Sequence, residues 1–336
     1  MRQSVTHSHL PNDIMKPTRS VLVTGGTTNI GFQAALSIAR AHPEYLVVIA
    51  SRTDGDGAAQ RINKTLKQEN TVYLRLDLSD TDNVRSFATN WPTQDFPPLQ
   101  ALVLNAGLQF PGALQTSPQG IEKTFAISHV GHALLFHLLV PHLATGARIV
   151  VTSSGTHDPA QKSGLPDAVY NSAEDLAHPP PATRNNPGRQ RYSTAKLCNV
   201  LWTYALHRRL SQTAPDRGLT ITAMDPGLVP GTGLAREAVW FERFLWSRVL
   251  THVIPLLRMV LSKNVHTPAE SGAALARLAV GSEVEGVSGR YFEGLEEIKS
   301  SRDSYDEGKQ DDLWEWTVGY LSQGRADEKA RFQEFK

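Results

Sequence analysis

Short apolar segments alternate with amphipathic segments over the first two thirds of the chain. Six runs predict strands, and their near-continuous apolar character is typical of parallel strands that are covered on both faces. These runs are Ser20–Thr24, Tyr45–Ala50, Thr71–Leu76, Ala101–Leu104, Arg148–Thr152 and Leu219–Met224. Helical periodicity follows over Ile30–Ala41, Gln60–Gln68, Thr81–Asn90, Pro118–Ala144 and Tyr192–Thr213. The alternation predicts an α/β protein with a doubly wound Rossmann fold, in which helices flank a mostly parallel sheet.

Three regions do not follow this alternation of strands and helices. Residues 1–18 are polar and interrupted by proline, so we expect a flexible N-terminal tail before a single domain over residues 19–336. Residues 155–190 are rich in Pro, Gly and Asn and predict a long surface insertion. Residues 229–265 are unusually apolar and aromatic. Their stretch Trp240–Leu261 is apolar nearly all round a helical projection, so it must be buried against something.

Composition narrows the class of protein. The chain has 336 residues, of which 40% are hydrophobic, so it can bury a sizeable core. A formal net charge of +1 gives no general basic field for nucleic acid. The one cysteine, Cys198, excludes an internal disulfide and fits a reducing compartment; we expect it to be a small buried residue. The sequence contains no run of 18 apolar residues, which a membrane-spanning helix would require, so we expect a cytoplasmic protein.

The segment VLVTGGTTNIG (21–31) is typical of a strand that runs into a phosphate-binding turn. Gly25 allows a close backbone approach, and the helix that opens at Ile30 and Gly31 directs its N-terminus at a pyrophosphate. Asn29 stands where a further glycine is expected, and Asn adopts unusual backbone angles better than most other residues. Taken alone, the segment is also compatible with an ordinary tight turn.

The second strand helps to decide between these interpretations. It ends at Ser51 and Arg52, where a dinucleotide-binding unit places the residue that contacts the adenosine ribose. An acidic residue there would accept a hydrogen bond from the 2′-hydroxyl of NAD, whereas an arginine suits a 2′-phosphate. The sequence therefore predicts NADP(H) over NAD(H). A solvated surface charge is the alternative interpretation of Arg52.

Six motifs in this order resemble those of the short-chain dehydrogenase/reductase family over roughly Ser20–Tyr291. They are TGGTTNIG (24–31), LDL (76–78), LNAG (104–107), TSS (152–154), YSTAK (192–196) and DPG (225–227). The resemblance implies a cofactor site. Its residues would be Gly25, Thr28, Asn29, Ile30, Gly31, Ser51, Arg52, Asp77, Leu78, Asn105, Ala106, Gly107, Tyr192, Lys196, Pro226, Gly227, Val229 and Thr232.

The YSTAK motif carries the predicted chemistry. Tyr192 and Lys196 are four residues apart and share one face of a helix. An ammonium at ~4 Å and an effective dielectric of ~20 is worth roughly 4 kcal/mol, enough to lower the pKa of a phenol by about three units. Tyr192 would then exchange a proton with a substrate oxygen. The resemblance implies that Ser154 anchors that oxygen and that Lys196 also holds the nicotinamide ribose; a chance YxxxK is the alternative.

One position departs from the family pattern. FAISHVGHALL (125–135) resembles NHxGHxLL, but Ser128 stands at the position of the family's catalytic asparagine. A serine hydroxyl also binds water, although it is shorter and lacks the paired donor and acceptor of an amide. We expect activity with an altered proton relay, and loss of activity is the alternative. No acidic or cysteine ligands accompany His129, His132, His137 and His142, so we expect core or interface histidines and no metal site.

The insertion and the segments YSTAKLCNVL (192–201) and PGLVPGTGLARE (226–237) resemble the retinol dehydrogenase and protochlorophyllide reductase branch. That branch favours NADPH and extended lipophilic substrates. We therefore expect an NADP-dependent oxidoreductase of a bulky lipophilic carbonyl or alcohol, in lipid or secondary metabolism. Residues 229–265 would form its substrate lid, with a membrane-contacting patch, a core helix or a subunit contact as alternatives. A homodimer and a cofactor-sensing or scaffold protein with little turnover also stay open.

Overall fold

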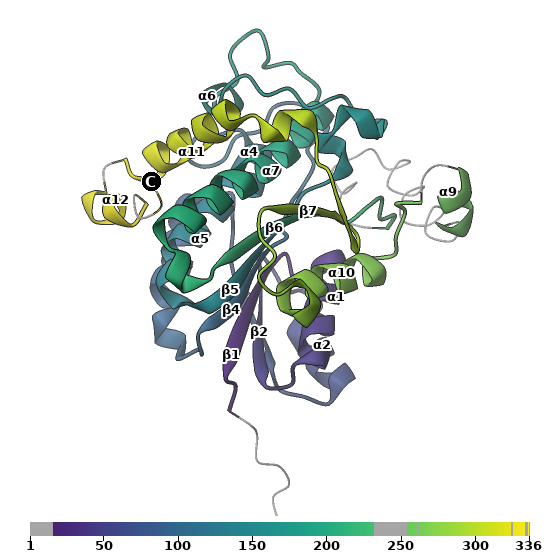
Figure 1. The fold of residues 1–336 in the computed structure, drawn as a ribbon, viewed down its shortest axis with the longest axis vertical. Coiled ribbons are helices and arrows are strands. Elements are labelled where there is room, and N and C mark those ends of the chain that lie inside the picture. Colours follow the sequence, from purple (N-terminus) through teal and green to yellow (C-terminus); the bar gives the residue numbers. More distant parts are fainter. Residues whose placement is uncertain (1–15, 232–253, 261–262, 324, 333–334, 336) are drawn as a thin grey trace, which may run out of the picture.

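The computed structural model describes residues 16–231, 254–260, 263–323, 325–332 and 335. Within them, the chain forms one eight-stranded sheet of order β3-β2-β1-β4-β5-β6-β7-β8 (Figure 1). The strands are β1 (Arg19–Thr24), β2 (Tyr45–Ser51), β3 (Thr71–Arg75), β4 (Leu99–Leu104), β5 (Leu143–Thr152), β6 (Thr220–Asp225), β7 (Arg290–Glu293) and β8 (Glu296–Ile298). Only β8 runs antiparallel to its neighbour, so the predicted doubly wound, mostly parallel sheet is confirmed.

Helices cover both faces of this sheet. They are α1 (Asn29–Ala41), α2 (Ala58–Leu66), α3 (Thr81–Asn90), α4 (Lys123–Phe125), α5 (Gly131–Leu139), α6 (Ala173–Ala177), α7 (Gly188–Thr213), α9 (Ile254–Val260), α10 (Pro268–Val280), α11 (Glu307–Leu321) and α12 (Ala326–Phe332). Figure 1 shows α1, α2 and α10 on one side of the strands, and α5, α7 and α11 on the other. This arrangement leaves the carboxyl ends of the strands as the free edge for a site.

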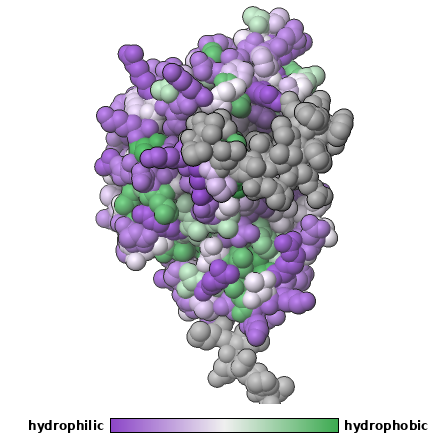
Figure 2. Space-filling model, turned by 90° about the vertical axis from the view of Figure 1, so that its right-hand side faces the viewer, coloured by the Kyte–Doolittle hydropathy of each residue, from purple (hydrophilic) through white to green (hydrophobic). Residues whose placement is uncertain are grey.

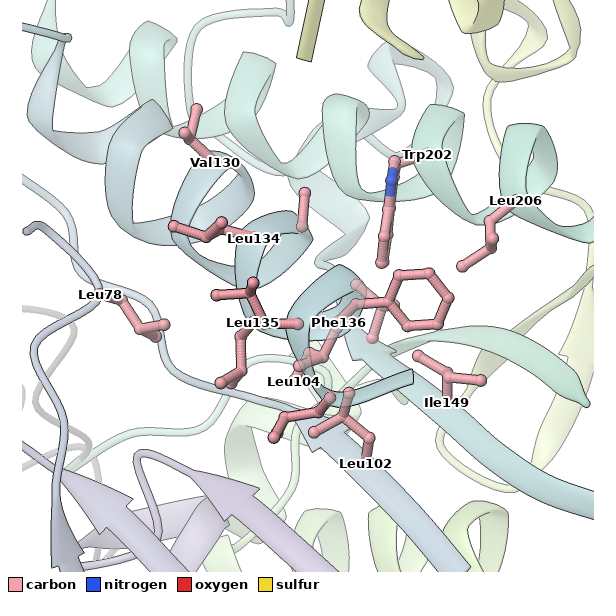
Figure 3. Packing of buried hydrophobic residues seen from close by; sticks show 14 of the residues in the cluster. Leu78, Leu102, Leu104, Val130, Leu134, Leu135, Phe136, Ile149, Trp202 and Leu206 are labelled. Carbon is pink, nitrogen blue, oxygen red and sulfur yellow. The ribbon is translucent and has the colours of Figure 1, made fainter. Parts of the chain in front are cut away.

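Each strand contributes side chains to both layers, because successive residues point to opposite faces. Val21 and Val23 lie in the cluster with α1 and α10, whereas Leu22 lies in the cluster with α5 and α7. All three side chains are fully buried. The larger cluster is drawn in Figure 3, where Leu102 and Leu104 of β4 lie below residues of α5 and α7. Burial on both faces explains why the strand segments lack polar alternation.

The predicted helix over Pro118–Ala144 is wrong at both ends. Helix α4 begins at Lys123, a π-helical turn spans Ala126–Val130, and α5 ends at Leu139. Strand β5 then begins at Leu143, five residues earlier than the predicted Arg148. Apolar periodicity cannot separate a fully buried helix from the buried strand that follows it. Residues Lys123–His142 have the length and mean hydropathy, 1.3, of a membrane span, but 94% of that window is buried inside the protein.

The sequence pattern also missed three elements near the C-terminus. Strands β7 and β8 are four and three residues long, too short for a periodic signal. Helix α10 packs along α1 so closely that a Cβ on Gly272 would lie 2.4 Å from the Cβ of Gln33. It begins with a capping box, in which the Thr267 hydroxyl accepts from the amide of Glu270 and the Glu270 carboxylate accepts from the amide of Thr267.

Part of the 155–190 segment is anchored to helix α11. The hydroxyl of Tyr170 donates to Asp312 Oδ2 at 2.6 Å, and the amide of Ala173 donates to the same oxygen at 2.8 Å. The indole of Trp316 donates to Glu174 Oε2 at 2.7 Å. These bonds hold the second half of the segment against the C-terminal helix, while residues 161–165 lie beside the cavity described below.

Candidate active site

A cavity of about 930 Å³ opens at the carboxyl ends of β1, β2, β4, β5 and β6. It brings together nearly all of the residues that the motifs predicted for a cofactor and for chemistry. Its walls include Gly25, Thr28, Asn29, Ile30, Gly31, Ser51, Arg52, Asp77, Leu78, Asn105, Ala106, Gly107, Ser154, Tyr192, Lys196, Pro226, Gly227 and Val229. Ser128 is not part of these walls, and Thr232 lies outside the described residues.

The turn after β1 has the backbone geometry of a phosphate cradle. Gly25 has φ +66°, and Asn29 at the start of α1 has φ +53°. The angle of Asn29 lies in the left-handed region, which asparagine tolerates better than most residues other than glycine. A Cβ on Gly31 would lie 2.3 Å from the carbonyl oxygen of Gly25 and 2.6 Å from Asn105 Nδ2. Only glycine fits there, so the backbone remains close enough to receive a pyrophosphate at the N-terminus of α1.

The left-handed angle of Asn29 predicts a small, directional effect on stability. Replacing Asn29 by Ala should lower the free energy of unfolding by about 1 kcal/mol, because an alanine Cβ is strained at positive φ. Asn29→Gly should match or slightly exceed the wild type. Urea denaturation measures both. Thr28→Ala is the matched control, since Thr28 has an extended backbone and its side chain makes no cap hydrogen bond. Equal losses for Ala and Gly at position 29 would contradict the strain argument.

Two polar residues at the end of β2, Ser51 and Arg52, have different surroundings. The hydroxyl of Ser51 donates to the carbonyl of Thr53 at 2.9 Å and lies 2.8 Å from the hydroxyl of Thr27, so it fastens the turn. Arg52 is exposed on the cavity wall, and among the described residues no hydrogen bond or ion pair engages its guanidinium. A guanidinium in this place suits a phosphate on the adenosine ribose.

The end of β4 is tied to the phosphate turn through Thr24. Its hydroxyl oxygen accepts from the amides of Asn105 and Ala106 at 2.9 and 3.0 Å. The side-chain amide of Asn105 donates to the carbonyl of Thr24 at 3.0 Å. At the end of β3, the carboxylate of Asp77 accepts from the amide and the hydroxyl of Ser79. These bonds fix the walls that would hold the nicotinamide ribose and the adenine.

Strand β5 and helix α7 bring the predicted catalytic groups together. Ser154 follows β5, and its side chain lies near enough to the hydroxyl of Tyr192 to lower the pKa of that phenol. The ammonium of Lys196 donates to the carbonyl of Thr152 at 2.9 Å and lies 5.6 Å from the centroid of the Tyr192 ring. Tyr192 and Lys196 are 6% and 3% exposed, respectively. The serine and tyrosine hydroxyls therefore form a pair that a single substrate oxygen can contact.

The pKa of Tyr192 differs from the expectation. Burial raises the pKa of Tyr192 well above its usual value, and the carboxylate of Asp225 raises it further, while the hydroxyl of Ser154 lowers it. Burial lowers the pKa of Lys196 to about 8, and Asp225 opposes that change. The expected lowering of the Tyr192 pKa by Lys196 is therefore wrong, because the ammonium points to the Thr152 carbonyl and because burial outweighs it.

Ser128 lies behind the cavity wall, in the π-helical turn. It is 1% exposed, and its hydroxyl has no hydrogen-bond partner among the described residues. Its carbonyl oxygen accepts from His132 Nδ1 at 3.1 Å, and His132 Nε2 lies 2.9 Å from the hydroxyl of Thr24. A role of Ser128 in a water relay stays a prediction. The side chain of His132 connects this turn to the end of β1.

The other histidines of this region belong to the core. Burial lowers the pKa of His129 and His137 to about 3 and that of His132 to about 4, so all three are neutral. His129 bonds the hydroxyl of Thr317 at 2.8 Å. The prediction of core histidines is confirmed for these three. Cys198 is fully buried, as predicted.

Two buried polar residues at or beside the site were not predicted from the sequence. Asp225, the first residue of the DPG motif, is 2% exposed and lines the cavity. His157 is fully buried, bonds the carbonyl of Ser154 through Nδ1 at 2.7 Å and accepts from the amide of Ser301 at 3.0 Å. The acidic residue of the DPG motif could have identified Asp225 from the sequence. Nothing near His157 in the sequence identifies Ser301 as its partner.

The remaining walls of the cavity are mixed in character. Apolar side chains come from Leu108, Ile127, Leu165, Leu228 and Val265, and polar ones come from Gln109, Gln161, Lys162, Ser163 and Arg189. Leu228 pairs with Val265 in an isolated parallel bridge, which holds together the two ends of the 229–265 segment. Most of the predicted lid, residues 232–253 and 261–262, lies outside the described residues. On the face in Figure 2, apolar residues form separate areas among hydrophilic ones.

Comparison with known proteins gives consistent relatives. A family model described as short chain dehydrogenase matches residues 19–173, and one described as AcuH dehydrogenase domain matches residues 236–330. Human polyprenol dehydrogenase is 31% identical over 89% of this chain and 84% of its own length. Human retinol dehydrogenase 14 is 30% identical over 88% and 84%. A zebrafish (Danio rerio) WW domain-containing oxidoreductase is 32% identical over 88% of this chain, which spans 66% of that relative's length.

A solved structure shares the fold. The 3-oxoacyl-[acyl-carrier protein] reductase from Brucella melitensis, in complex with NAD, is similar with a TM-score of 0.58 and 16% identity. The alignment covers 83% of this chain and 97% of that one. At this identity the likeness concerns the fold alone.

Proposed function

The chain belongs to the short-chain dehydrogenase/reductase family, and from that premise we propose that it is an NADPH-dependent oxidoreductase of a bulky lipophilic small molecule. It would reduce a carbonyl group or oxidise the corresponding alcohol. The observation that carries the proposal is the single cavity that joins Arg52 and the glycine turn to Ser154, Tyr192 and Lys196. A cofactor and a reacting oxygen would therefore share one enclosed space.

The residues present fit a nicotinamide dinucleotide. The glycine turn and the N-terminus of α1 would hold the pyrophosphate, because a Cβ on Gly31 would fill the space against Gly25. Asp77 and Leu78 would hold the adenine, and Asn105, Lys196 and Thr152 lie where the nicotinamide ribose would be held. When bound, the cofactor supplies or accepts the hydride.

The side chains of this chain would handle the proton and the substrate oxygen. The hydroxyl of Ser154 would donate a hydrogen bond to the carbonyl oxygen and hold it beside Tyr192. Tyr192 would give its proton to that oxygen as the carbon is reduced, or take one from an alcohol in the reverse direction. The raised pKa of Tyr192 keeps the phenol protonated at neutral pH, which suits an acid in reduction. The Lys196 ammonium would stabilise the phenolate that proton transfer leaves.

The Lys196 pKa predicts the alkaline side of the pH profile. Lys196 carries its charge below about pH 8 and loses it above, because burial lowers its pKa to about 8. The value of kcat/KM should therefore fall about tenfold per pH unit above that point, since this parameter reports groups of the free enzyme. In a Lys196→Arg variant the overall rate should be lower but stay level up to about pH 10, because a guanidinium keeps its charge. An unchanged alkaline limb in this variant would exclude Lys196 as its source.

The substrate class rests on the cavity walls and on the relatives. Apolar groups such as Ile127, Leu165 and Val229 would contact an extended hydrocarbon part. The names of two relatives, polyprenol dehydrogenase and retinol dehydrogenase 14, refer to lipophilic alcohols, which supports the same class here. Residues 229–265 would close over this part as a lid. We also propose a place in lipid or secondary metabolism, a cytoplasmic location with peripheral membrane contact, and a homodimer.

One assay tests the proposal. NADPH oxidation is followed by its absorbance against a panel of lipophilic aldehydes and ketones, with NADH in parallel. Turnover that favours NADPH supports the proposed activity. NADPH binding without turnover on every panel member favours the competing function, a cofactor-sensing or scaffold protein. The specific observation in favour of that competitor is Ser128, whose buried hydroxyl does not reach the cavity wall.

A further inference from the structure

A buried carboxylate stands at the reacting end of the cavity, near enough to the Lys196 ammonium to raise its pKa but, in the described part of the chain, outside ion-pair distance of it. Asp225 ends β6, is 2% exposed and lines the same cavity as Tyr192 and Lys196. Among the described residues, no arginine or lysine forms an ion pair with it. A buried charge is costly unless something compensates it. Among the described residues, two hydrogen bonds from neutral groups and the Lys196 charge beyond ion-pair distance compensate it in part.

These two bonds fix the position of the carboxylate. Oδ1 accepts from the amide of Gly227 at 3.0 Å, and Oδ2 accepts from Asn264 Nδ2 at 2.7 Å. The absence of a side chain at Gly155 makes room for the carboxylate, since a Cβ there would lie 2.9 Å from Oδ2. Gly155 directly follows Ser154, so the carboxylate lies against the backbone of the segment that carries the proposed substrate anchor, and it acts electrostatically on Tyr192.

From this placement, and resting on the proposed function, we infer that Asp225 is a positioning residue whose negative charge favours the oxidised, positively charged nicotinamide over the reduced, neutral one. The ring gains one positive charge when a hydride and its electron pair leave for the substrate carbonyl carbon, while Tyr192 gives its proton to the carbonyl oxygen. A fixed negative charge in a cavity of low dielectric stabilises that gain. The same charge raises the pKa of Tyr192, which keeps its proton available. Both effects favour carbonyl reduction over alcohol oxidation.

The competing explanation is that Asp225 only braces the backbone. Its bonds to Gly227 and Asn264 join the end of β6 to the segment that follows residue 263. An amide at position 225 preserves this brace, because its oxygen accepts from Gly227 and its nitrogen can pair with a rotated Asn264 amide. Asp225→Asn therefore removes the charge and retains the shape, whereas Asn264→Ala removes one bond of the brace and retains the charge.

The experiment is a binding measurement on the full chain. Dissociation constants for NADP⁺ and NADPH are measured by isothermal titration calorimetry, and the readout is their ratio. In Asp225→Asn, NADP⁺ should weaken about tenfold relative to NADPH, whereas Asn264→Ala should leave the ratio within about twofold of wild type, whatever its effect on overall affinity. Asp158→Asn is the matched control, because this carboxylate lies outside the cavity walls and accepts a hydrogen bond from the amide of Ala160.

The possible failures are distinguishable. If the wild-type chain binds neither NADP⁺ nor NADPH, the proposed function fails. If it binds both and the ratio in Asp225→Asn equals that of the wild type, the inference about Asp225 is overturned while the proposed function stands. If Asn264→Ala changes the ratio as much as Asp225→Asn does, the brace rather than the charge sets it, which also overturns the inference.

Discussion

Replacing Tyr192 by phenylalanine should lower kcat by roughly 100-fold to 10,000-fold, the usual range for loss of a general acid or base. The substitution removes one oxygen and retains the ring, which is 6% exposed and packs beside the Lys196 ammonium. The cofactor end of the cavity is untouched, so the dissociation constant for NADPH should stay within about threefold of wild type. Steady-state kinetics at saturating cofactor, together with a fluorescence titration of NADPH, measure the two effects separately.

Helix α7 offers a matched control for this result. Tyr204 is also buried on α7, but its hydroxyl lies 2.7 Å from the hydroxyl of Ser300 and outside the cavity. Tyr204→Phe should keep kcat near the wild-type value while it loses one buried hydrogen bond, which costs about 1 kcal/mol of stability. If Tyr192→Phe retains more than a tenth of the wild-type kcat, Tyr192 is not the proton donor, and another group in the cavity must serve.

The residues of the site could be predicted well where a local motif ends a strand. Gly25, Asp77, Asn105 and Ser154 follow four different strands, and a parallel sheet brings those carboxyl ends to one edge. Their meeting therefore needs only the strand assignments and the order of the chain. The backbone angle of Asn29 is also a local feature, because it follows from the turn itself.

The parts that could not be predicted depend on long-range contacts. His157 accepts a hydrogen bond from Ser301, and the carboxylate of Asp225 accepts one from Asn264; both partners are distant in the sequence. The predicted lowering of the Tyr192 pKa was wrong for a related reason. The spacing to Lys196 predicts a nearby cation, but burial, which opposes ionisation, is a property of the folded protein. Apolar periodicity likewise failed where a buried helix and strand β5 adjoin.

Replacing Arg52 by alanine should weaken NADPH binding by roughly 10-fold to 100-fold and leave NADH binding almost unchanged. A charge-assisted bond between a guanidinium and a phosphate is worth about 1.5–3 kcal/mol, and the 2′-phosphate is the one group that distinguishes the two cofactors. The exposed position of Arg52 favours the lower half of that range, since solvent and salt screen the pair. Calorimetric titrations of both cofactors at low and high salt measure the effect, and the NADPH affinity of the wild type should show the steeper salt dependence.

Arg75 separates a specific contact from a general positive field. It is an exposed cation that pairs in register with Ser51 across β2 and β3, yet it does not line the cavity. Arg75→Ala should therefore change NADPH affinity by no more than about twofold, which is the share expected from screened long-range attraction. If Arg52→Ala weakens NADPH and NADH equally, or weakens neither, Arg52 is a solvated surface charge. The preference for NADP(H) would then need another phosphate ligand, and the acidic neighbours Asp54 and Asp56 on the same wall would make NAD(H) the better candidate cofactor.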